Sequence, residues 1–137
     1  MKTWLVDTGP LVAYLDRNDP KHEQVVPVWN RFSGRFETTS AVITEAMQLV
    51  AGTASGPDLL AELVLRSGME VLDLCQPRAL REAARLMAKY AGTPMDFADA
   101  TLVLLAEKLG VNEILTLDRR GFSVFRIRQR QPFRLLL

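Results

Sequence analysis

Short apolar runs alternate along the chain with segments whose apolar residues recur every three or four positions. The runs are typical of buried strands, and the recurring positions are typical of amphipathic helices. Alternation of the two with short loops predicts an α/β fold with a mostly parallel central sheet flanked by helices. Strands are predicted at Lys2–Val6, Phe36–Thr39, Met69–Leu74, Glu113–Leu117, Ser123–Arg128 and Phe133–Leu137. Helices are predicted at Leu11–Leu15, Lys21–Phe32, Ala41–Ala51, Asp58–Arg66, Arg78–Tyr90 and Thr93–Leu109.

Two of the helix starts carry capping residues. Ser40 is predicted to be the N-cap of the helix that follows it. Thr93 is predicted to open a capping box with Asp96, with proline at the first helical position. Asp99 would then lie nearly two turns into its helix. No repeat, linker or low-complexity segment interrupts the pattern, so residues 1–137 are predicted to form one domain.

Four carboxylates are placed where such a fold would bring them together. Asp7 and Asp118 each follow an apolar run predicted as a strand, and open parallel sheets bind ligands beyond the carboxyl ends of their strands. Glu45 lies early in a helix that begins at the same edge. Asp99 lies in a largely apolar helix, where an unpaired carboxylate would be unfavourable. The four are therefore predicted to gather at one edge of the sheet.

Gathered carboxylates call for compensation by a proton or a cation. Two of them ~4 Å apart at an effective dielectric constant of ~20 repel by about 4 kcal/mol. Oxygen ligands favour Mg²⁺ or Mn²⁺ over zinc, and such an ion can activate water for attack on a phosphodiester. Each acid also has a structural explanation: Asp7 and Asp118 as turn residues, Glu45 as an exposed helix charge, and Asp96 as part of a cap.

The rest of the composition narrows the chemistry. Cys75 is the only cysteine and His22 the only histidine, which excludes an internal disulfide, a cysteine-based zinc site and a histidine-rich metal site. Cys75 is predicted to be a small core residue, and His22 a surface helix residue. No apolar run approaches the ~18 residues of a membrane span, and none forms a signal-peptide core. A cytoplasmic location without membrane contact is therefore expected.

Charge is unevenly distributed along the chain. Residues 1–118 carry a net charge of −5, whereas residues 119–137 carry six arginines and no acid. This basic end has two open interpretations: a solvated edge strand, or a patch that binds phosphates or an acidic partner beside the acidic residues.

Four segments together resemble the PIN-domain ribonucleases, particularly the VapC-like toxins of bacterial and archaeal toxin–antitoxin pairs. They recur in the family's order and approximate spacing, and the resemblance covers nearly the whole chain. The segments are Val6-Asp7-Thr8-Gly9, Ser40 to Glu45, Asp96-Phe97-Ala98-Asp99-Ala100 and Leu115-Thr116-Leu117-Asp118-Arg119-Arg120-Gly121-Phe122.

The resemblance implies a PIN-like α/β/α sandwich and a set of site residues. Its acidic quartet would hold one or two Mg²⁺ or Mn²⁺ ions, with an additional acid and two supporting hydroxyls. The quartet is Asp7, Glu45, Asp99 and Asp118, the additional acid is Asp96, and the hydroxyls are Thr8 and Thr116.

The implied activity is metal-dependent endonucleolytic cleavage of RNA, such as tRNA, rRNA or mRNA, by the toxin of a toxin–antitoxin pair. The implied partners are a second copy of the chain, in a homodimer, and an antitoxin protein whose tail enters the acidic groove. Arg119 and Arg120, beside Asp118, are hypothesised to contact RNA or the antitoxin.

Two alternatives come from other classes. A phosphatase or phospho-receiver could use Asp7 as phosphate acceptor, but the second carboxylate and the late lysine that such proteins need are missing. The other alternative is a catalytically silent PIN-like module that binds RNA or protein without cleaving. Nucleotide-binding glycine motifs are absent.

Overall fold

Five parallel strands form the centre of the computed structural model, which describes residues 1–137. Their order across the sheet is β3-β2-β1-β4-β7, and every neighbouring pair is parallel. All five carboxyl ends therefore meet at one edge, which we call the carboxyl edge. The strands are β1 Thr3–Val6, β2 Arg35–Thr39, β3 Glu70–Leu72, β4 Glu113–Leu115 and β7 Arg134–Leu135.

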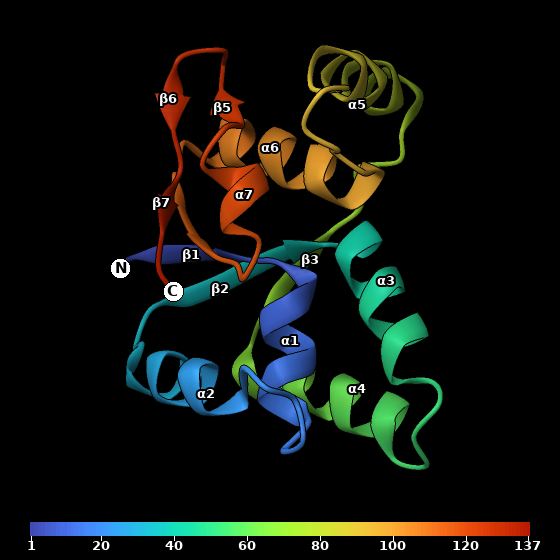
Figure 1. Ribbon diagram of the computed structural model, residues 1–137, viewed down its shortest axis with the longest axis vertical. Coiled ribbons are helices and arrows are strands. Elements are labelled where there is room, and N and C mark those ends of the chain that lie inside the picture. The colour runs from blue at the N-terminus through green and yellow to red at the C-terminus, as the bar shows by residue number, and fades with distance from the viewer.

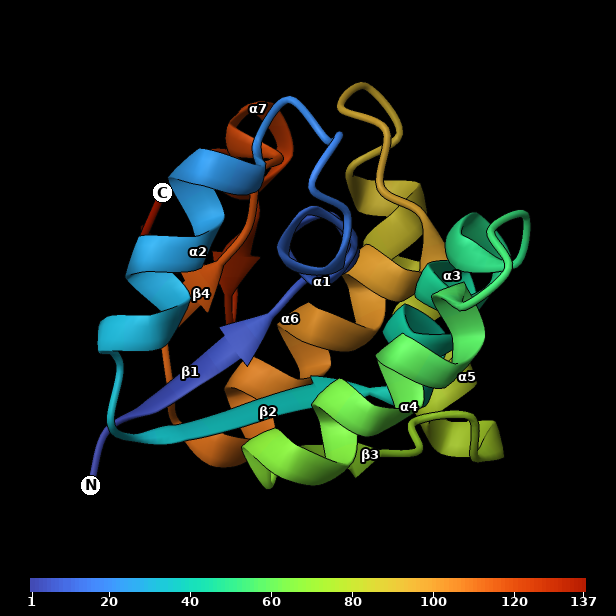
Figure 2. The ribbon, with the colours of Figure 1, turned by 90° about the horizontal axis from the view of Figure 1, so that it is seen from below.

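Helices cover both faces of this sheet, so the predicted α/β class with a parallel central sheet is confirmed. Figure 1 shows α1, α2 and α4 on one side of the strands and α5, α6 and α7 on the other, with α3 beyond the end of the sheet. Figure 2 shows the first group on the near side of β1 and β2, with α6 behind them. The helices are α1 Thr8–Leu15, α2 His22–Arg31, α3 Ser40–Val50, α4 Gly56–Ser67, α5 Pro77–Lys89, α6 Phe97–Leu109 and α7 Arg119–Phe122.

Helix α6 is the central helix of the core. Eight of its residues are buried, and it contacts β2, α3 and α5. It leads into β4, and therefore runs against the strand direction and begins at the carboxyl edge. No helix of the structure has the length and apolar content that crossing a membrane requires.

Both predicted N-caps were wrong, by one residue for α3 and by three residues for α6. The N-cap of α3 is Thr39, whose hydroxyl accepts the N–H of Val42 at 3.3 Å, and Ser40 is the first helical residue. The capping box of α6 is formed by Asp96 and Asp99, because the N–H of Thr93 bonds to the carbonyl of Tyr90 and closes the preceding turn. Asp99 consequently lies in the first turn of α6, at the carboxyl edge.

The segment Ser123–Arg128 was predicted as one strand, and this was wrong. The N–H groups of Val124 and Phe125 bond to the carbonyl of Gly121, which extends the turn of α7. Only β5, Arg126–Ile127, is extended, and it pairs with β6, Gln131–Pro132, in an antiparallel hairpin outside the main sheet.

Two further expectations concern the edge strands. The last strand was predicted correctly, since β7 pairs with β4 at the edge of the sheet. Cys75 was predicted to be buried but is exposed, because β3 ends at Leu72 and the Asp73 side chain accepts the N–H of Cys75 in a tight turn. His22 opens α2 and is half-buried, with Nδ1 at 2.7 Å from the carbonyl oxygen of Ala13.

Candidate active site

Asp7 lies at the centre of the acidic residues. It follows β1 directly and caps α1, with Oδ1 accepting the N–H of Thr8 at 2.8 Å and Oδ2 accepting the hydroxyl of Thr116 at 2.7 Å. The residue is only 7% exposed. Burial raises the pKa of Asp7 to about 6; the bonds from Thr116 and Thr8 oppose this rise, and the charges of Glu45 and Asp118 add to it. Glu45 and Asp118 therefore lie close enough to act on Asp7.

Thr116 connects Asp7 to Asp118. Its hydroxyl donates to Asp7 and accepts the N–H of Asp118 at 3.0 Å. Asp118 in turn caps α7, with Oδ1 accepting the N–H of Gly121 at 3.0 Å. A Cβ on residue 121 would lie 2.5 Å from Asp118 Oδ2, so only glycine allows this close turn. Gly121 is thus part of the site, and sequence reasoning had not singled it out.

Thr8 connects Asp7 to Glu45. The Thr8 hydroxyl donates to Glu45 Oε1 at 2.6 Å, which holds the carboxylate of α3 against the start of α1. A buried pair of hydroxyls fixes the start of α3 against α6. The hydroxyl oxygens of Thr39 and Thr101 lie 2.8 Å apart. Because the Thr101 hydroxyl donates to the carbonyl of Ala98 in its own helix, the Thr39 hydroxyl is the donor between the two threonines. The sequence offered no signal for this buried pair beyond two threonines in apolar surroundings.

Asp99 joins the cluster from the first turn of α6. Its Oδ2 accepts the N–H of Asp96 at 3.2 Å, and Asp96 Oδ1 accepts the N–H of Asp99 at 2.8 Å. Burial raises the pKa of Asp99 to about 8, and the charges of Asp96 and Asp7 contribute to the rise. At neutral pH the site therefore favours a bound proton or a cation that compensates the gathered charge.

The donors suit a hard divalent cation. All of them are carboxylate or hydroxyl oxygens, the ligands that Mg²⁺ and Mn²⁺ prefer. As the side chains stand, no three acidic, histidine or cysteine residues form a closed metal-binding group. Asp99 and Asp118 each use one oxygen to accept a backbone N–H. Mg²⁺ commonly binds through one or two carboxylates and keeps several waters, so this open set fits it.

The structure thus brings together the predicted quartet, Asp96 and the two supporting threonines.

The two arginines that were hypothesised to contact RNA or an antitoxin lie beside this cluster. Arg119 and Arg120 begin α7, directly after Asp118, but the Arg119 guanidinium donates to the carbonyl of Leu137. Arg120 is exposed and makes no side-chain bond. Their contact with RNA or an antitoxin stays a prediction.

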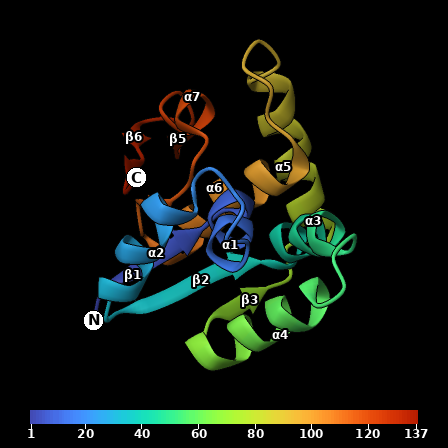
Figure 3. The same ribbon diagram turned by 60° about the horizontal axis from the view of Figure 1, so that its bottom comes forward.

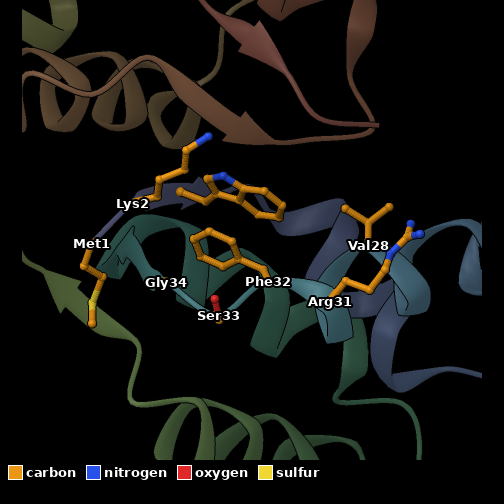
Figure 4. A pocket seen from close by; sticks show the side chains of 8 residues that line it. Met1, Lys2, Val28, Arg31, Phe32, Ser33 and Gly34 are labelled. Carbon is orange, nitrogen blue, oxygen red and sulfur yellow. The ribbon is translucent and has the colours of Figure 1, made fainter.

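A hollow of about 430 Å³ lies against this site, between α3 and the start of α6. Glu45, Asp96 and Phe97 are among the residues that line it. Another pocket, of about 580 Å³, lies at the amino ends of β1 and β2, opposite the carboxyl edge. Figure 4 shows its aromatic floor and the side chains of Lys2 and Arg31; no acidic residue lines it. Only the first hollow is therefore part of the acidic site.

Comparison with known proteins identifies the family. Residues 4–127 match the model of the PIN domain. This chain belongs to the PIN domain family. A curated PIN-domain relative, ribonuclease VapC26 of Mycobacterium tuberculosis, is 36% identical over 126 residues, covering 89% of this chain and 91% of the relative.

Two crystal structures share the PIN fold. VapC20 of Mycobacterium tuberculosis, described as a sarcin-ricin loop cleaving toxin, has a TM-score of 0.78 at 16% identity and covers 90% of this chain and 96% of its own. DNA-bound VapBC from Salmonella typhimurium has a TM-score of 0.61 at 21% identity, covering 99% of this chain and 98% of its own. At these identities the two structures support the fold alone.

Replacing Thr116 by valine should weaken the PIN site without unfolding it. The isosteric change removes the donor to Asp7 and the acceptor for Asp118. We expect a loss of about 1–2 kcal/mol in the free energy of unfolding and a fall of about 10- to 100-fold in metal affinity or cleavage. Denaturant unfolding and metal titration measure both. Thr53→Val is the matched control, since Thr53 is exposed in the α3–α4 connection and its hydroxyl donates only to the carbonyl of Val50. Equal behaviour of the two variants would contradict the role of Thr116.

Proposed function

We propose that this PIN domain is a Mg²⁺- or Mn²⁺-dependent endoribonuclease and the toxin of a toxin–antitoxin pair. The observation that carries the proposal is the acidic cluster around buried Asp7, in which burial and, after it, neighbouring charges raise the pKa values of Asp7 and Asp99. Such a cluster is suited to a divalent cation and therefore to phosphodiester hydrolysis. The 36% identity to a protein named a ribonuclease supports RNA as the substrate.

The proposed roles follow from the hydrogen bonds. Asp7 and Asp99 are the principal ligands, and Glu45 and Asp118 complete the site or orient water. When bound, the ion supplies an activated water and compensates the charge that develops on the phosphate. Thr8 and Thr116 fix the carboxylates by donating to Glu45 and Asp7.

Asp96 orients Asp99 through their capping box, and we propose it as an additional, outer acid of the site. Because Asp96 is exposed and lines the hollow beside Glu45, it faces the side from which a substrate strand would enter. Arg119 and Arg120 are proposed to contact RNA or the antitoxin. An antitoxin protein and a second copy of the chain are the proposed partners, in the cytoplasm; the VapC name of the curated relative supports the antitoxin.

Cleavage of total cellular RNA by the purified protein tests the proposal. Reactions contain Mg²⁺, Mn²⁺ or EDTA, and the protein is first freed of any co-purified antitoxin by denaturation and refolding. We expect discrete fragments with either ion and none in EDTA, and the fragment ends would identify the target. Binding of RNA without cleavage by folded, metal-loaded protein would contradict the nuclease and favour the silent binding module.

A further inference from the structure

A row of basic side chains runs along α5. Arg78, Arg81, Arg85 and Lys89 are spaced by three, four and four residues, which places them on one face of the helix. They cover about 16 Å of the helix axis. All four are exposed, and none takes part in an ion pair or a side-chain hydrogen bond. Lys89 contacts only the ring of Tyr90, at 5.4 Å. These cations are therefore available to a ligand.

The tip of the β5–β6 hairpin faces α5 and has an unusual backbone. Arg128 and Gln129 both have positive φ angles, of 51° and 64°, and the N–H of Arg130 bonds to the carbonyl of Ile127 at 3.1 Å. Ile127 pairs with Gln131, so the hairpin loop has three residues, and Arg128 and Gln129 are the two central residues of its turn. Asparagine and glycine are preferred where both central φ angles are positive. Side chains other than glycine and asparagine are strained in this conformation. Arg128 lies here despite that strain, which motivates the hypothesis that its side chain has a function in binding.

Arg128 is held in place by α6. Its backbone N–H donates to Glu107 Oε2 at 2.9 Å, and its guanidinium donates to the Glu107 carbonyl at 3.0 Å. Tyr90, just after α5, accepts the N–H of Arg126 at 3.0 Å and packs edge-on against Phe125. The hairpin and α5 are thus fixed relative to each other.

Two adjoining hollows lie between α5, α6 and the hairpin, and we call them together the basic groove. Their volumes are about 430 Å³ and 400 Å³, and they share Leu104, Arg128 and two acidic residues, Glu82 and Glu107, so the cations of the lining outnumber its carboxylates. Figure 3 shows α5 and the hairpin standing apart, with α6 between them. The cations that line the groove are Arg78, Arg85, Lys89, Lys108 and Arg128.

The basic groove begins close to the acidic site. The start of α5 joins the two: Cys75 lines the hollow of the acidic site together with Asp96, and the nearby residues Gln76 and Arg78 line the basic groove. An aromatic chain links the other wall to the same site, since Phe125 packs against Phe122 of α7, the helix that Asp118 caps. One polyanionic strand could therefore contact both places.

We propose that the basic groove binds the phosphate backbone of RNA and holds the strand beside the acidic site. The inference rests on the proposed ribonuclease function. A cluster of carboxylates repels a polyanion, so its substrate must be held by cations placed nearby. Unpaired arginine and lysine side chains in a row supply this attraction without sequence preference. An acidic peptide is the competing occupant, and it becomes an outcome of the test.

The test is RNA binding in EDTA, where no cleavage is expected. A fluorescently labelled single-stranded RNA oligonucleotide is titrated with protein at several salt concentrations. For Arg85→Gln/Lys89→Gln we expect about tenfold weaker binding, and a slope of log K against log[salt] that is smaller by about 1.4. The control Arg17→Gln/Lys21→Gln removes the same charge from two exposed residues of the α1–α2 connection and should leave the slope unchanged.

The outcomes separate this proposal from the nuclease itself. An unchanged slope for Arg85→Gln/Lys89→Gln with normal cleavage overturns the basic groove and leaves the nuclease intact. A reduced slope in a protein that never cleaves supports the groove and contradicts the nuclease. Displacement of RNA by nucleic acid but not by a glutamate-rich peptide is expected. Tight binding of that peptide, with no measurable binding of RNA, overturns the proposal in favour of a protein partner.

The turn provides an independent readout. Arg128→Asn/Gln129→Gly installs the sequence that this turn prefers, so its melting temperature should be equal to or higher than that of the wild type. Its RNA affinity should fall severalfold. Gln129→Gly alone should relieve strain and leave the RNA affinity nearly unchanged. A strong fall in melting temperature with intact RNA binding would mean that Arg128 has a structural role only.

Discussion

Replacement of Asp7 by asparagine should lower the rate of RNA cleavage at least about a hundredfold and yet stabilise the fold. Activity falls because Asp7 is the carboxylate on which the charges of the cluster act. Stability rises because burial holds the pKa of Asp7 near 6, above its ordinary value of 3.8. At neutral pH the buried charge therefore destabilises the protein by roughly 3 kcal/mol. Asparagine removes that charge, and the loss of one of the two acceptors for Thr8 and Thr116 offsets only about 1–2 kcal/mol of the gain. Single-turnover cleavage and denaturant unfolding near neutral pH measure the two effects.

The opposite signs make the experiment decisive. A variant that lost activity by misfolding would lose stability as well, whereas this one should gain it. Asp58→Asn is the matched control, because Asp58 lies exposed in the first turn of α4, away from the cluster. It should change cleavage by less than about twofold. Near-normal cleavage by the Asp7 variant would contradict the proposed ligand set.

The acidic cluster itself could be predicted from the sequence. Asp7 and Asp118 follow strands that are parallel in the sheet, so their proximity is a consequence of topology. The position of Asp99 could not be predicted as closely, because both Thr93 and Asp96 are good N-caps. The choice between them depends on the carbonyl of Tyr90, which binds the N–H of Thr93 and ends the earlier turn.

The partners of the arginines at the basic end of the chain could not be predicted from the sequence. That end contains six arginines and no acid, which leaves open whether they pair within the protein. Their partners come from distant segments: Arg134 pairs with Glu113, and Arg128 bonds to Glu107. No local pattern encodes such contacts, and the same holds for the hydroxyl pair Thr39–Thr101. The cluster and its two supporting hydroxyls, Thr8 and Thr116, could therefore be anticipated, whereas the contacts between distant segments could not.

The wild-type protein in EDTA should lose stability as the pH rises from about 4 to about 8, and Mg²⁺ should restore it. The pKa values of Asp7 and Asp99 in the folded protein are about 6 and about 8, above the ordinary value of 3.8 for both. Groups with raised pKa values stabilise the fold while they are protonated, and this contribution is lost as the pH passes their folded pKa values. The raised pKa of Asp7 alone should lower the free energy of unfolding by roughly 3 kcal/mol across this pH range, which corresponds to a fall of about 10 °C in melting temperature.

A bound ion replaces the protons, because it compensates the same charges. The rise in melting temperature on addition of Mg²⁺ should therefore be small near pH 5 and large near pH 8, and its size should grow with the ion concentration. Asp7→Asn/Asp99→Asn removes both titrating groups of the site, so its stability should depend much less on pH and respond little to Mg²⁺. The remaining pH dependence comes from Glu37, whose pKa is raised by burial and by Glu70. Thermal melts across pH, with EDTA or Mg²⁺, measure both proteins. An equal Mg²⁺ response in the two would place the ion elsewhere, whereas a flat profile in the wild type would mean that these carboxyls do not share a buried, repulsive site.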